Sequence, residues 1–576
     1  MGTSLIVTGE EEKSKMSKLL LILLGSSIFV VLVMPTNEQK DAQKKASDQE
    51  KFRMKFAQTM MGSVAESEAC DKLEGDAKKA CLVKIIDKVK EKMGKLRAEE
   101  ERVMDDGEKI LPHLDGVLDK MRLESVLLSI FFPLSTLAYV DPAFRGSSYT
   151  LISYLLHGRM KGEAKSWMEE IVDDFGPRMA GTMALENTID AIAQKLRIEG
   201  FQNVHTEPVP GIPHFVRGED RVTLLEPRRL DLNILAIPGC QPGHVRGQAV
   251  VLESFDDFRK VNVQGKIVVM VHKWMGYSWT VQNRQGGVEA ARWGAIGYLA
   301  KSITPESMGS PHTGWGKSGI PSASITLEDA EMLKRLSKRG KRIEIEMNIR
   351  SRVMPDPVIS RNTIFDIKGS HHPNEVIILS AHLDSWDVGQ GALDDAAGCS
   401  AVFHAMKAIK QLAERQPRFQ PKRTIRGIFW TAEEQGFYGG RQYYADHGNG
   451  QHGEKFVFVS ESDNGAFKPT NSTANLAFKG TREQMDIMNE IVTIINSYGI
   501  PLKVIHSNGQ GDVQQFADDG VPSTMYISDK GWEFYFNFHH SAGDYADKLS
   551  AEDLDYTAAI FAVLAHVIGN MREWVR

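Results

Sequence analysis

The sequence has few cysteines and no strong excess of charge, and each of these absences narrows the range of functions. Only four cysteines occur in 576 residues, too few for a disulfide framework. Lysine and arginine number 69 against 75 aspartates and glutamates, so the formal net charge of -6 gives no reason to expect a nucleic-acid partner. Hydrophobic residues make up 42% and charged residues 25%, as in ordinary globular proteins. A chain of this length exceeds one hydrophobic core, and we expect several domains.

Two hydrophobic segments near the N-terminus resemble export signals. The first, Leu19–Met34, is long for the apolar part of a signal peptide but short for a membrane-spanning helix, and residues 1–36 are assigned to a signal or anchor. The second, Val126–Ala138, ends in small residues that suit cleavage, so residues 121–138 form either a second signal-like segment or a buried helix. We expect a secretory-pathway protein, either secreted or lysosomal, or a type II membrane protein if the first segment is retained.

Residues 37–120 are rich in Lys, Glu, Asp and Ala, and we interpret them as a charged helical extension. Apolar residues recur there at three- and four-residue steps, which predicts an amphipathic helix. They are Leu82, Ile85, Ile86, Val89, Met93 and Leu96. Cys70 and Cys81 would lie about 16 Å apart on one continuous helix, too far for a disulfide, whereas a turn between them would allow one. Their pairing stays open, and no catalytic constellation occurs in this region.

The remaining chain divides into three parts that differ in their pattern of predicted helices and strands. Residues 139–212 form the first part of a predicted core, with a helical pattern from Trp167 to about Ile212. In residues 213–352 short strands alternate with a predicted helix, Gly286–Ala300, and we expect an inserted domain with its own small sheet. In residues 353–576 apolar strands alternate with helices, as in sheets covered on both faces. The expected fold class is α/β, with a mixed, mostly parallel sheet flanked by helices.

Acids and histidines follow the ends of several predicted strands. His382 follows one such strand, the pair Glu433 and Glu434 follows the next, and Asp463 follows a third. His540 comes after a run of aromatic residues. Ligands of α/β sheets collect beyond the carboxyl ends of the strands. Four separate segments are therefore expected to bring these side chains to one edge of the sheet.

This combination of side chains is suited to zinc, which accepts imidazole nitrogen and carboxylate oxygen. Two histidines and three carboxylates can hold two ions if one carboxylate bridges them. The stretch Leu379–Val402 contains one histidine and four aspartates beside an apolar strand, and unpaired carboxylates there would cost several kcal/mol. Two divalent cations would offset that charge. One carboxylate of the Glu433–Glu434 pair can then bind metal while the other transfers a proton.

From about Gly176 to the C-terminus the chain resembles the co-catalytic zinc peptidases of the M28 type. The resemblance rests on the stretches GPRMAG, SPHTG, HLDSWDVGQGALDD, WTAEEQG, ESDNG and FHHSAGD. It implies a zinc aminopeptidase-like core, with residues 213–352 as a protease-associated-like cap domain and residues 353–576 as the two-zinc peptidase core. The N-terminal 120 residues lie outside the resemblance.

The resemblance also implies which residues bind metal. His382 and Asp463 would bind one zinc ion. Glu434 and His540 would bind the second ion. Asp394 would bridge the two ions, so that each chain would hold two Zn²⁺.

Further roles follow from the same resemblance. Glu433 would be the general base and acid. Asp384 would be a carboxylate that holds the imidazole of His382 in the orientation needed to bind metal. Asp395 follows the bridging residue at a peptide that is unusually strained in this family. Asp512 stands where relatives keep an aspartate near the site. Ala396–Ala397 replace residues that are often glycines, which would narrow the floor of the pocket slightly.

Several other residues admit more than one interpretation. Spacing alone does not say whether His539 or His540 binds metal, and the family pattern selects His540. His312 in SPHTG either reaches the pocket from the inserted domain or is an ordinary loop histidine. Cys399 is predicted to be a small buried side chain. Asn471 begins a glycosylation sequon that is meaningful only in an exported protein.

The implied activity is that of a carboxypeptidase or dipeptidase acting on dipeptides or short peptides with free termini. A metal-bridging hydroxide would attack the scissile carbonyl while Glu433 moves the proton. The family implies a homodimer, small peptide substrates and no nucleic acid, with membrane contact only through a retained N-terminal anchor. The alternative is an inactive receptor or adhesion ectodomain on the same fold, which is disfavoured because all five ligand positions are occupied. Glutaminyl cyclisation at a single zinc would require a vacant ligand set.

Overall fold

The computed structural model describes residues 18–24, 27–33 and 140–574, apart from residues 307, 449, 472 and 573. The chain divides into two compact units, Met1–Ala138 and Tyr139–Arg576. All of the predicted metal ligands belong to the second unit.

The described residues of the hydrophobic segment Leu19–Met34 belong to two strands. β1 (Lys18–Leu24) and β2 (Ser27–Val33) pair antiparallel. The amphipathic helix predicted from Leu82 to Leu96 and the segment Val126–Ala138 lie outside the described residues. In the described part of the chain, no helix combines the length and apolar character needed to cross a membrane.

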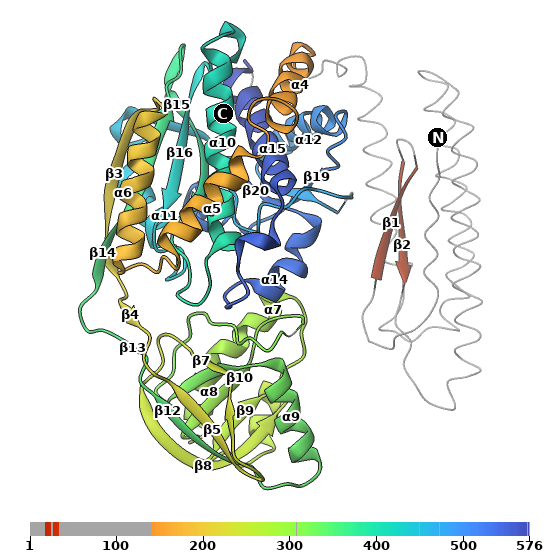
Figure 1. The fold of residues 1–576 in the computed structure, drawn as a ribbon. Helices are drawn as coiled ribbons and strands as arrows, with labels where there is room; N and C mark the ends of the chain where they lie inside the picture. Colours follow the sequence, from red (N-terminus) through yellow and green to blue (C-terminus); the bar gives the residue numbers. More distant parts are fainter. Residues whose placement is uncertain are drawn as a thin grey trace, which may run out of the picture. The chain divides into compact units, whose positions relative to one another are not determined.

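The second unit contains an eight-stranded mixed sheet, which forms the upper part of the ribbon in Figure 1. In spatial order its strands are β19 (Lys503–His506), β18 (Asn475–Lys479), β20 (Ser523–Ile527), β17 (Lys455–Glu461), β15 (His372–His382), β16 (Arg423–Trp430), β14 (Val358–Ile367) and β3 (Gln202–Ile212). The four central strands β20, β17, β15 and β16 are parallel to one another. Strands β14 and β3 at one edge run antiparallel to their neighbours, and β18 runs antiparallel to β20.

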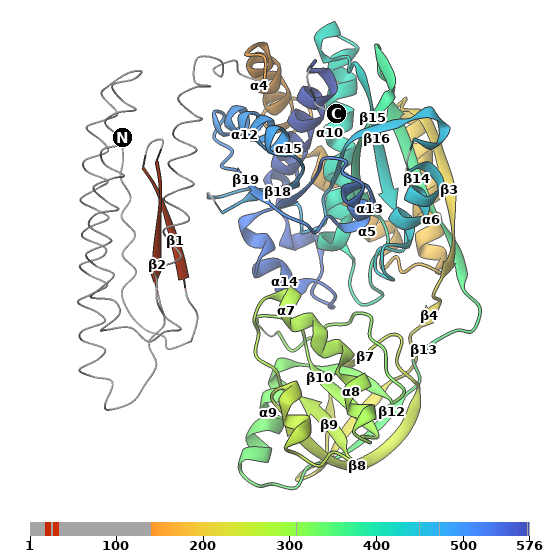
Figure 2. The ribbon, with the colours of Figure 1, turned by 180° about the vertical axis from the view of Figure 1, so that it is seen from behind.

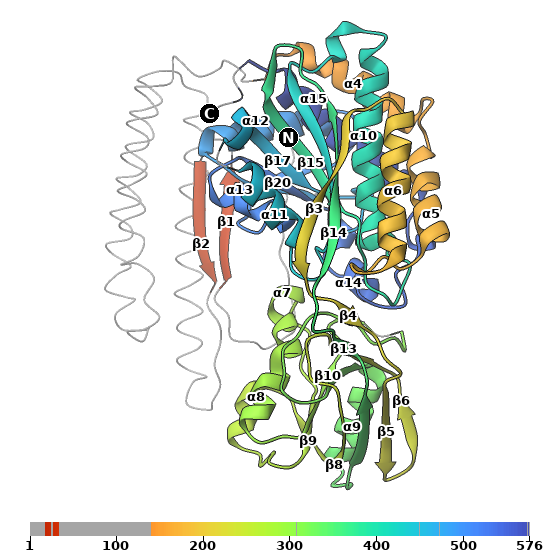
Figure 3. The same ribbon diagram turned by 90° about the vertical axis from the view of Figure 1, so that its left-hand side faces the viewer.

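Helices cover both faces of this sheet. Successive side chains of a strand point to opposite faces, so each buried strand contributes to two hydrophobic cores. Ile377 and Leu379 of β15 belong to the larger hydrophobic core, whereas Val376 and Ile378 belong to a smaller core on the other face. The first layer consists of α4 (Ala143–Leu156), α5 (Glu163–Phe175), α6 (Met183–Ile198), α10 (Ala397–Ala413), α12 (Arg482–Asn496) and α15 (Ala551–Asn570), and the second of α11 (Tyr438–His447) and α13 (Gln514–Asp518). Figure 3 shows α5, α6 and α10 on one side of the sheet and α11 and α13 on the other. The predicted α/β class is confirmed.

Residues 213–352, which we call the inserted lobe, contain a second eight-stranded sheet with its own hydrophobic clusters. In spatial order its strands are β6 (Leu230–Leu232), β5 (Arg221–Glu226), β12 (Glu344–Ile349), β8 (Gly243–Leu252), β9 (Ile267–Met270), β10 (Gly297–Lys301), β11 (Ser322–Ile325) and β7 (Ile234–Ala236). Its α-helices are α7 (Tyr277–Thr280), α8 (Gly286–Arg292) and α9 (Leu327–Lys338). Two short strands, β4 (Phe215–Val216) and β13 (Arg352–Val353), pair where the chain enters and leaves the lobe (Figure 2).

The predicted helix Gly286–Ala300 is wrong in its second half. α8 ends at Arg292, and Gly294 adopts a φ of +80°, which ends the helix because only glycine takes this conformation easily. The chain then enters β10, in which every residue is buried. A short strand buried on both faces shows no alternation of polar and apolar residues, so its sequence does not differ from that of a buried helix.

The helical pattern predicted from Trp167 to Ile212 also ends earlier. Helices α5 and α6 cover the first part, but Gln202–Ile212 forms the edge strand β3. Pro208 and Pro210 lie in this strand, and proline is tolerated at a sheet edge, where its missing N–H is not needed.

Candidate metal centre

Adjacent parallel strands deliver most of the predicted ligands. His382 is the last residue of the central strand β15. Glu434 lies just beyond its neighbour β16, and Asp463 lies two residues beyond β17 on the other side. Because the three strands are parallel and adjacent, their carboxyl ends meet at one edge of the sheet. Asp394 comes from the turn Ala392–Ala396 that precedes α10.

The fifth predicted ligand, His540, completes a continuous chain of short contacts. His382 Nε2 lies 3.0 Å from Asp394 Oδ1 and 3.6 Å from Asp463 Oδ1. His540 Nε2 lies 3.3 Å from Asp394 Oδ2 and 3.1 Å from Glu434 Oε2. Asp394 therefore stands between the two histidines, with one further carboxylate on each side. The structure brings all five residues together.

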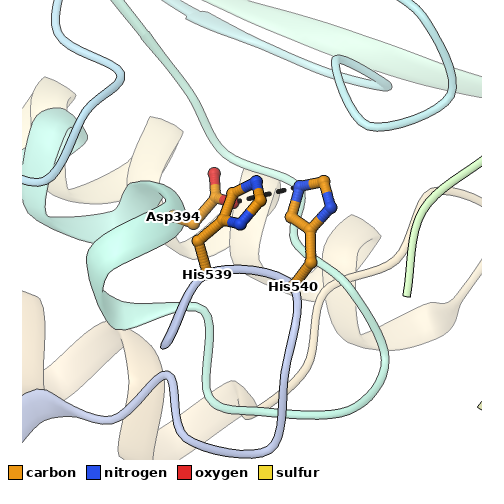
Figure 4. Close-up of side chains that lie close together, drawn as sticks. All are labelled: Asp394, His539 and His540. Carbon is orange, nitrogen blue, oxygen red and sulfur yellow. Dashed lines mark ion pairs between the residues drawn. The ribbon is translucent and has the colours of Figure 1, made fainter. Parts of the chain in front are cut away.

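His539 lies against the ring of His540, as Figure 4 shows together with Asp394. The two imidazole centroids are 3.7 Å apart at an interplanar angle of 19°. Ligand atoms of Asp394, His539 and His540 fall within 4.8 Å of one another. The short contacts to Asp394 and Glu434, however, come from Nε2 of His540. This geometry favours His540 as the ligand and leaves His539 as its neighbour.

Two further groups of side chains have the spacing of metal ligands. His382, Asp394 and Glu434 form one, and His382, Asp395 and Asp463 form the other. Asp395 was not predicted to be a ligand. Its Oδ1 accepts from an amide at the start of α10 and its Oδ2 accepts from the backbone N–H of His382, so its carboxylate also holds the strand end in place.

Buried oxygen atoms at the cluster lack hydrogen-bond donors. His382 is fully buried, and Asp394 and Glu434 are only 4% and 6% exposed. Within the described part of the chain, Asp394 Oδ2 and Glu434 Oε1 make no hydrogen bond. Leaving a buried carboxylate oxygen without a hydrogen-bond donor is unfavourable, so the cluster fits one or more cations. Imidazole and carboxylate together fit zinc.

The pKa values in the cluster also indicate an excess of buried negative charge. Burial raises the pKa of Glu434 well above its ordinary value, and the carboxylate of Asp394 raises it further. Burial also raises the pKa of Asp463, although His382 partly opposes this. Burial disfavours protonation of His382, but the surrounding carboxylates of Asp384, Asp394 and Asp463 outweigh this and raise its pKa well above the ordinary value. The cluster therefore contains more carboxylates than positively charged groups to balance them.

Asp384 holds two segments of the site together. Its Oδ1 and Oδ2 accept from the backbone N–H groups of Glu433 and Glu434, at 3.1 and 3.2 Å. Its backbone carbonyl lies 3.0 Å from Nδ1 of His382, whereas the carboxylate is 3.7 Å away. The carbonyl can only accept, so Nδ1 carries a proton, and Nε2 faces the acids.

Two residues that sequence reasoning did not single out support the turn that carries Asp394. Arg178 is fully buried, and its guanidinium donates to four carbonyl groups around the loop that follows β15. Asp544 Oδ1 accepts from the N–H groups of Ala392 and Leu393, at 2.9 and 2.7 Å. Both lie in stretches that the resemblance quotes, GPRMAG and FHHSAGD, but neither stretch shows what the residue contacts. The peptide bond between Asp394 and Asp395 is cis.

The other residues discussed from sequence have clear positions. Asp512 is fully buried, accepts from the N–H of Gly440 and donates its own N–H to a glutamate of β17. Cys399 is buried, with its Sγ 3.1 Å from the carbonyl of His382. Asn471 lies in an exposed turn. Cys70 and Cys81 lie outside the described residues.

Comparison with known proteins assigns the chain to a family. The model of peptidase family M28 matches residues 362–565. The chain is 39% identical over 437 residues to mouse carboxypeptidase Q, covering 73% of this chain and 89% of the mouse protein. It is 38% identical over 434 residues to human carboxypeptidase Q, with the same coverage. Fold, side-chain cluster and relatives together define a zinc-dependent peptidase, a hydrolase. The chain belongs to peptidase family M28.

Solved structures agree with this assignment. The peptidase M28 precursor from Shewanella amazonensis matches with a TM-score of 0.69 at 28% identity, over 75% of this chain and 98% of that one. The zinc aminopeptidase of Bacillus subtilis matches with a TM-score of 0.53 at 20% identity, over 71% of this chain and 95% of that one, and shares the fold.

Proposed function

We propose that the protein is a two-zinc exopeptidase that hydrolyses dipeptides or short peptides with free termini. The observation that carries the proposal is the position of Asp394 between two half-sites. One half-site is His382 with Asp463, and the other is His540 with Glu434. A carboxylate with one oxygen toward each half-site is the arrangement expected of a bridging ligand.

The five residues would hold the ions, and the protein supplies the remaining chemistry. When bound, two zinc ions would activate a water molecule and stabilise negative charge on the scissile carbonyl oxygen. A cavity with an accessible volume of about 10 Å³ lies between Trp386, Asp394, Glu434 and His540, which is room for about one water molecule.

Glu433 is proposed as the general base and acid. Its backbone N–H is tied to Asp384, which fixes the position of the residue beside the ligand Glu434. Burial raises the pKa of the Glu433 carboxyl well above its ordinary value, while the positive field of His382 acts against this. A raised carboxyl pKa suits a group that takes a proton from water and returns it to the leaving amine.

Substitution of the proposed base tests the function. The Glu433→Gln variant should keep its zinc, because Glu433 lies outside the two half-sites, while kcat for a dipeptide falls by about 10²- to 10⁴-fold. Glu483→Gln, at an exposed position on α12, is the matched control and should retain full activity. Elemental analysis and a dipeptide hydrolysis assay provide the two measurements. A Glu433→Gln variant with the activity of the wild type would contradict the role of Glu433.

The alternative of an inactive receptor or adhesion ectodomain predicts a different result. Such a protein has no need of a complete ligand set, whereas here all five positions carry side chains able to bind zinc. Folded protein with no zinc by elemental analysis, and no peptidase activity after zinc is added, would favour that alternative.

The location and assembly of the enzyme are also proposals. We propose a protein of the secretory pathway, secreted or lysosomal, that forms a homodimer and contacts membranes only if Leu19–Met34 is retained as an anchor. The inserted lobe, residues 213–352, would act as a cap that limits the site to small peptides. N-terminal sequencing and the native mass of protein recovered from cells test these points.

A further inference from the structure

A loop of the inserted lobe pairs directly with the segment that carries His540. His312 and Ser541 form an antiparallel bridge, and the N–H of Thr313 donates to the carbonyl of His540 at 2.8 Å. The ring of His312 donates from Nε2 to the carbonyl of Asn537 at 2.9 Å. Nearby, Tyr277 of α7 stacks on an aromatic ring of α14 (Phe534–Phe538), and Figures 1 and 2 both show the two helices side by side.

The backbone of His540 needs this support. Its φ is +59°, in the left-handed region that costs a residue with a side chain about 1–2 kcal/mol. Such a conformation persists only where the surroundings hold it. The bond from Thr313 to the carbonyl of His540 comes from the inserted lobe, so this lobe helps to hold the metal-binding residue in its conformation.

The ring of His540 is oriented by the same loop. Its Nδ1 lies 3.2 Å from the carbonyl of Thr313, which can only accept a hydrogen bond. The ring proton therefore sits on Nδ1, and the lone pair of Nε2 points toward Asp394 and Glu434. Arg284 Nη2 is 3.5 Å from the same Nδ1, but a guanidinium can only donate, and the closer carbonyl decides the tautomer. A neutral imidazole with a free Nε2 is the form that binds metal.

We propose that the loop Pro311–Gly314 of the inserted lobe positions His540 as a metal ligand. Thr313 fixes the backbone and the ring tautomer of His540, and His312 anchors the loop to the core segment at Asn537. The inference rests on the proposed two-zinc function and adds a role for the lobe beyond covering the site. The lobe and the second half-site are then one unit, and weakening their contact should release the ion held by His540 and Glu434 first.

His312 is the residue through which this can be tested. It is 1% exposed, its N–H donates to the hydroxyl of Ser302 within the lobe, and its ring donates to the core. His312→Phe removes the donor and keeps the ring volume. His312→Gln keeps an N–H donor near the position of Nε2. His272→Phe is the matched control, because His272 is a buried histidine of the same lobe, 5% exposed.

The measurements are zinc per chain in the full-length protein and the rate at which each ion passes to a competing chelator. For His312→Phe we expect one ion to be lost about 10-fold faster or more than from the wild type, the usual effect of removing a group that supports a ligand. The His312→Gln variant should be close to the wild type. The His272→Phe variant should keep both ions even if its melting temperature falls.

The outcomes separate the two proposals. If His312→Phe holds both ions as long as the wild type does, or if His272→Phe loses zinc equally fast, the positioning role is wrong. If the wild type itself binds no zinc, the proposed function fails instead.

Exchange of the Thr313 amide with deuterium gives a reciprocal test. Coupling between two sites acts in both directions, so removing zinc should loosen the contact that supports the ligand. Mass-spectrometric exchange over Pro311–Gly314 should be faster in zinc-free protein than in the zinc-loaded form. Equal exchange in the two forms would contradict the coupling.

Discussion

Individual buried charges explain how the site is held in place. Arg178 is enclosed completely, and its guanidinium donates to the carbonyls of Gly176, Leu383, Gln390 and Gly391 at 2.8–2.9 Å. Burial lowers the pKa of this guanidinium, while nearby carboxylates act to raise it. Three of these carbonyls belong to the irregular loop after β15 that leads directly to Asp394, and the fourth, of Gly176, connects this loop to the segment of Arg178 itself.

Replacing Arg178 should cost much of the stability of the protein. Arg178→Met keeps a long side chain but leaves buried carbonyls without donors, and we expect a loss of about 3–5 kcal/mol in the free energy of unfolding. Lys195→Met, at an exposed ion pair with Glu170, is the control and should change little. Urea denaturation measures both variants. A small effect of Arg178→Met would mean that water can replace the guanidinium.

At the scale of elements, the sheet places the ligands while an ion-pair cluster ties its edge strand to a helix. Glu207 on β3 lies 3.0 Å from His205 on the same strand and 3.0 Å from His447 at the end of α11. Partial burial raises the pKa of Glu207, but the bonds to the two histidines outweigh this and lower it to about 2. The bond to Glu207 raises the pKa of His205 above its ordinary value.

These shifts predict a pH window for the contribution of Glu207 to stability. A carboxyl with a lowered pKa stabilises the fold above its unfolded pKa of about 4.3, and the effect is lost as the pH falls toward 2. A histidine with a raised pKa stabilises the fold below its unfolded pKa of about 6.5, and the effect is lost as the pH rises through its folded value. The cost of Glu207→Gln should therefore be largest between about pH 4.5 and 6.5.

Urea denaturation of the wild type and Glu207→Gln at pH 5.5 and 8.5 measures this difference. The two proteins share the same metal centre, so its own pH dependence cancels in the comparison. An equal cost at both pH values would show that the contribution of Glu207 does not depend on the charge of the histidines.

At the scale of the whole molecule, the proposed ions join segments that lie far apart in the sequence. The ligand positions run from His382 to His540, and the loop around His312 reaches the same site from the inserted lobe. A ligand that binds only the folded state stabilises it by an amount that grows with its concentration relative to the dissociation constant. Zinc should therefore contribute to the stability of the second unit as well as to activity.

Removal of zinc should lower the free energy of unfolding. At free zinc 100 times above the dissociation constant, each ion contributes about 2.7 kcal/mol, and a chelator removes this contribution. Glu433→Gln should show the same zinc dependence as the wild type, whereas Asp394→Asn should lose most of it. Thermal unfolding with and without chelator measures the effect. A melting temperature that chelation leaves unchanged would contradict structural binding of zinc.

Local patterns in the sequence were enough to indicate the α/β class and the segments that carry the proposed ligands. Apolar strands such as β15 and β17 can be recognised because both of their faces are buried. The residues at or just beyond their carboxyl ends, His382 and Asp463, must then meet at one edge of a parallel sheet. Where the local pattern was ambiguous, as in β3 and β10, the expectation of a helix failed.

The tertiary structure alone decided how those ligands are supported. The guanidinium of Arg178 donates to backbone carbonyls, and Thr313 acts through its own N–H and carbonyl. Backbone groups are the same in every residue, so the sequence does not show these contacts. The contact between Thr313 and His540 joins positions 227 residues apart, and only the packing of the inserted lobe against the core brings them together. The sequence specifies which side chains are present, whereas the position of the proton on an imidazole depends on which atom the fold places beside it.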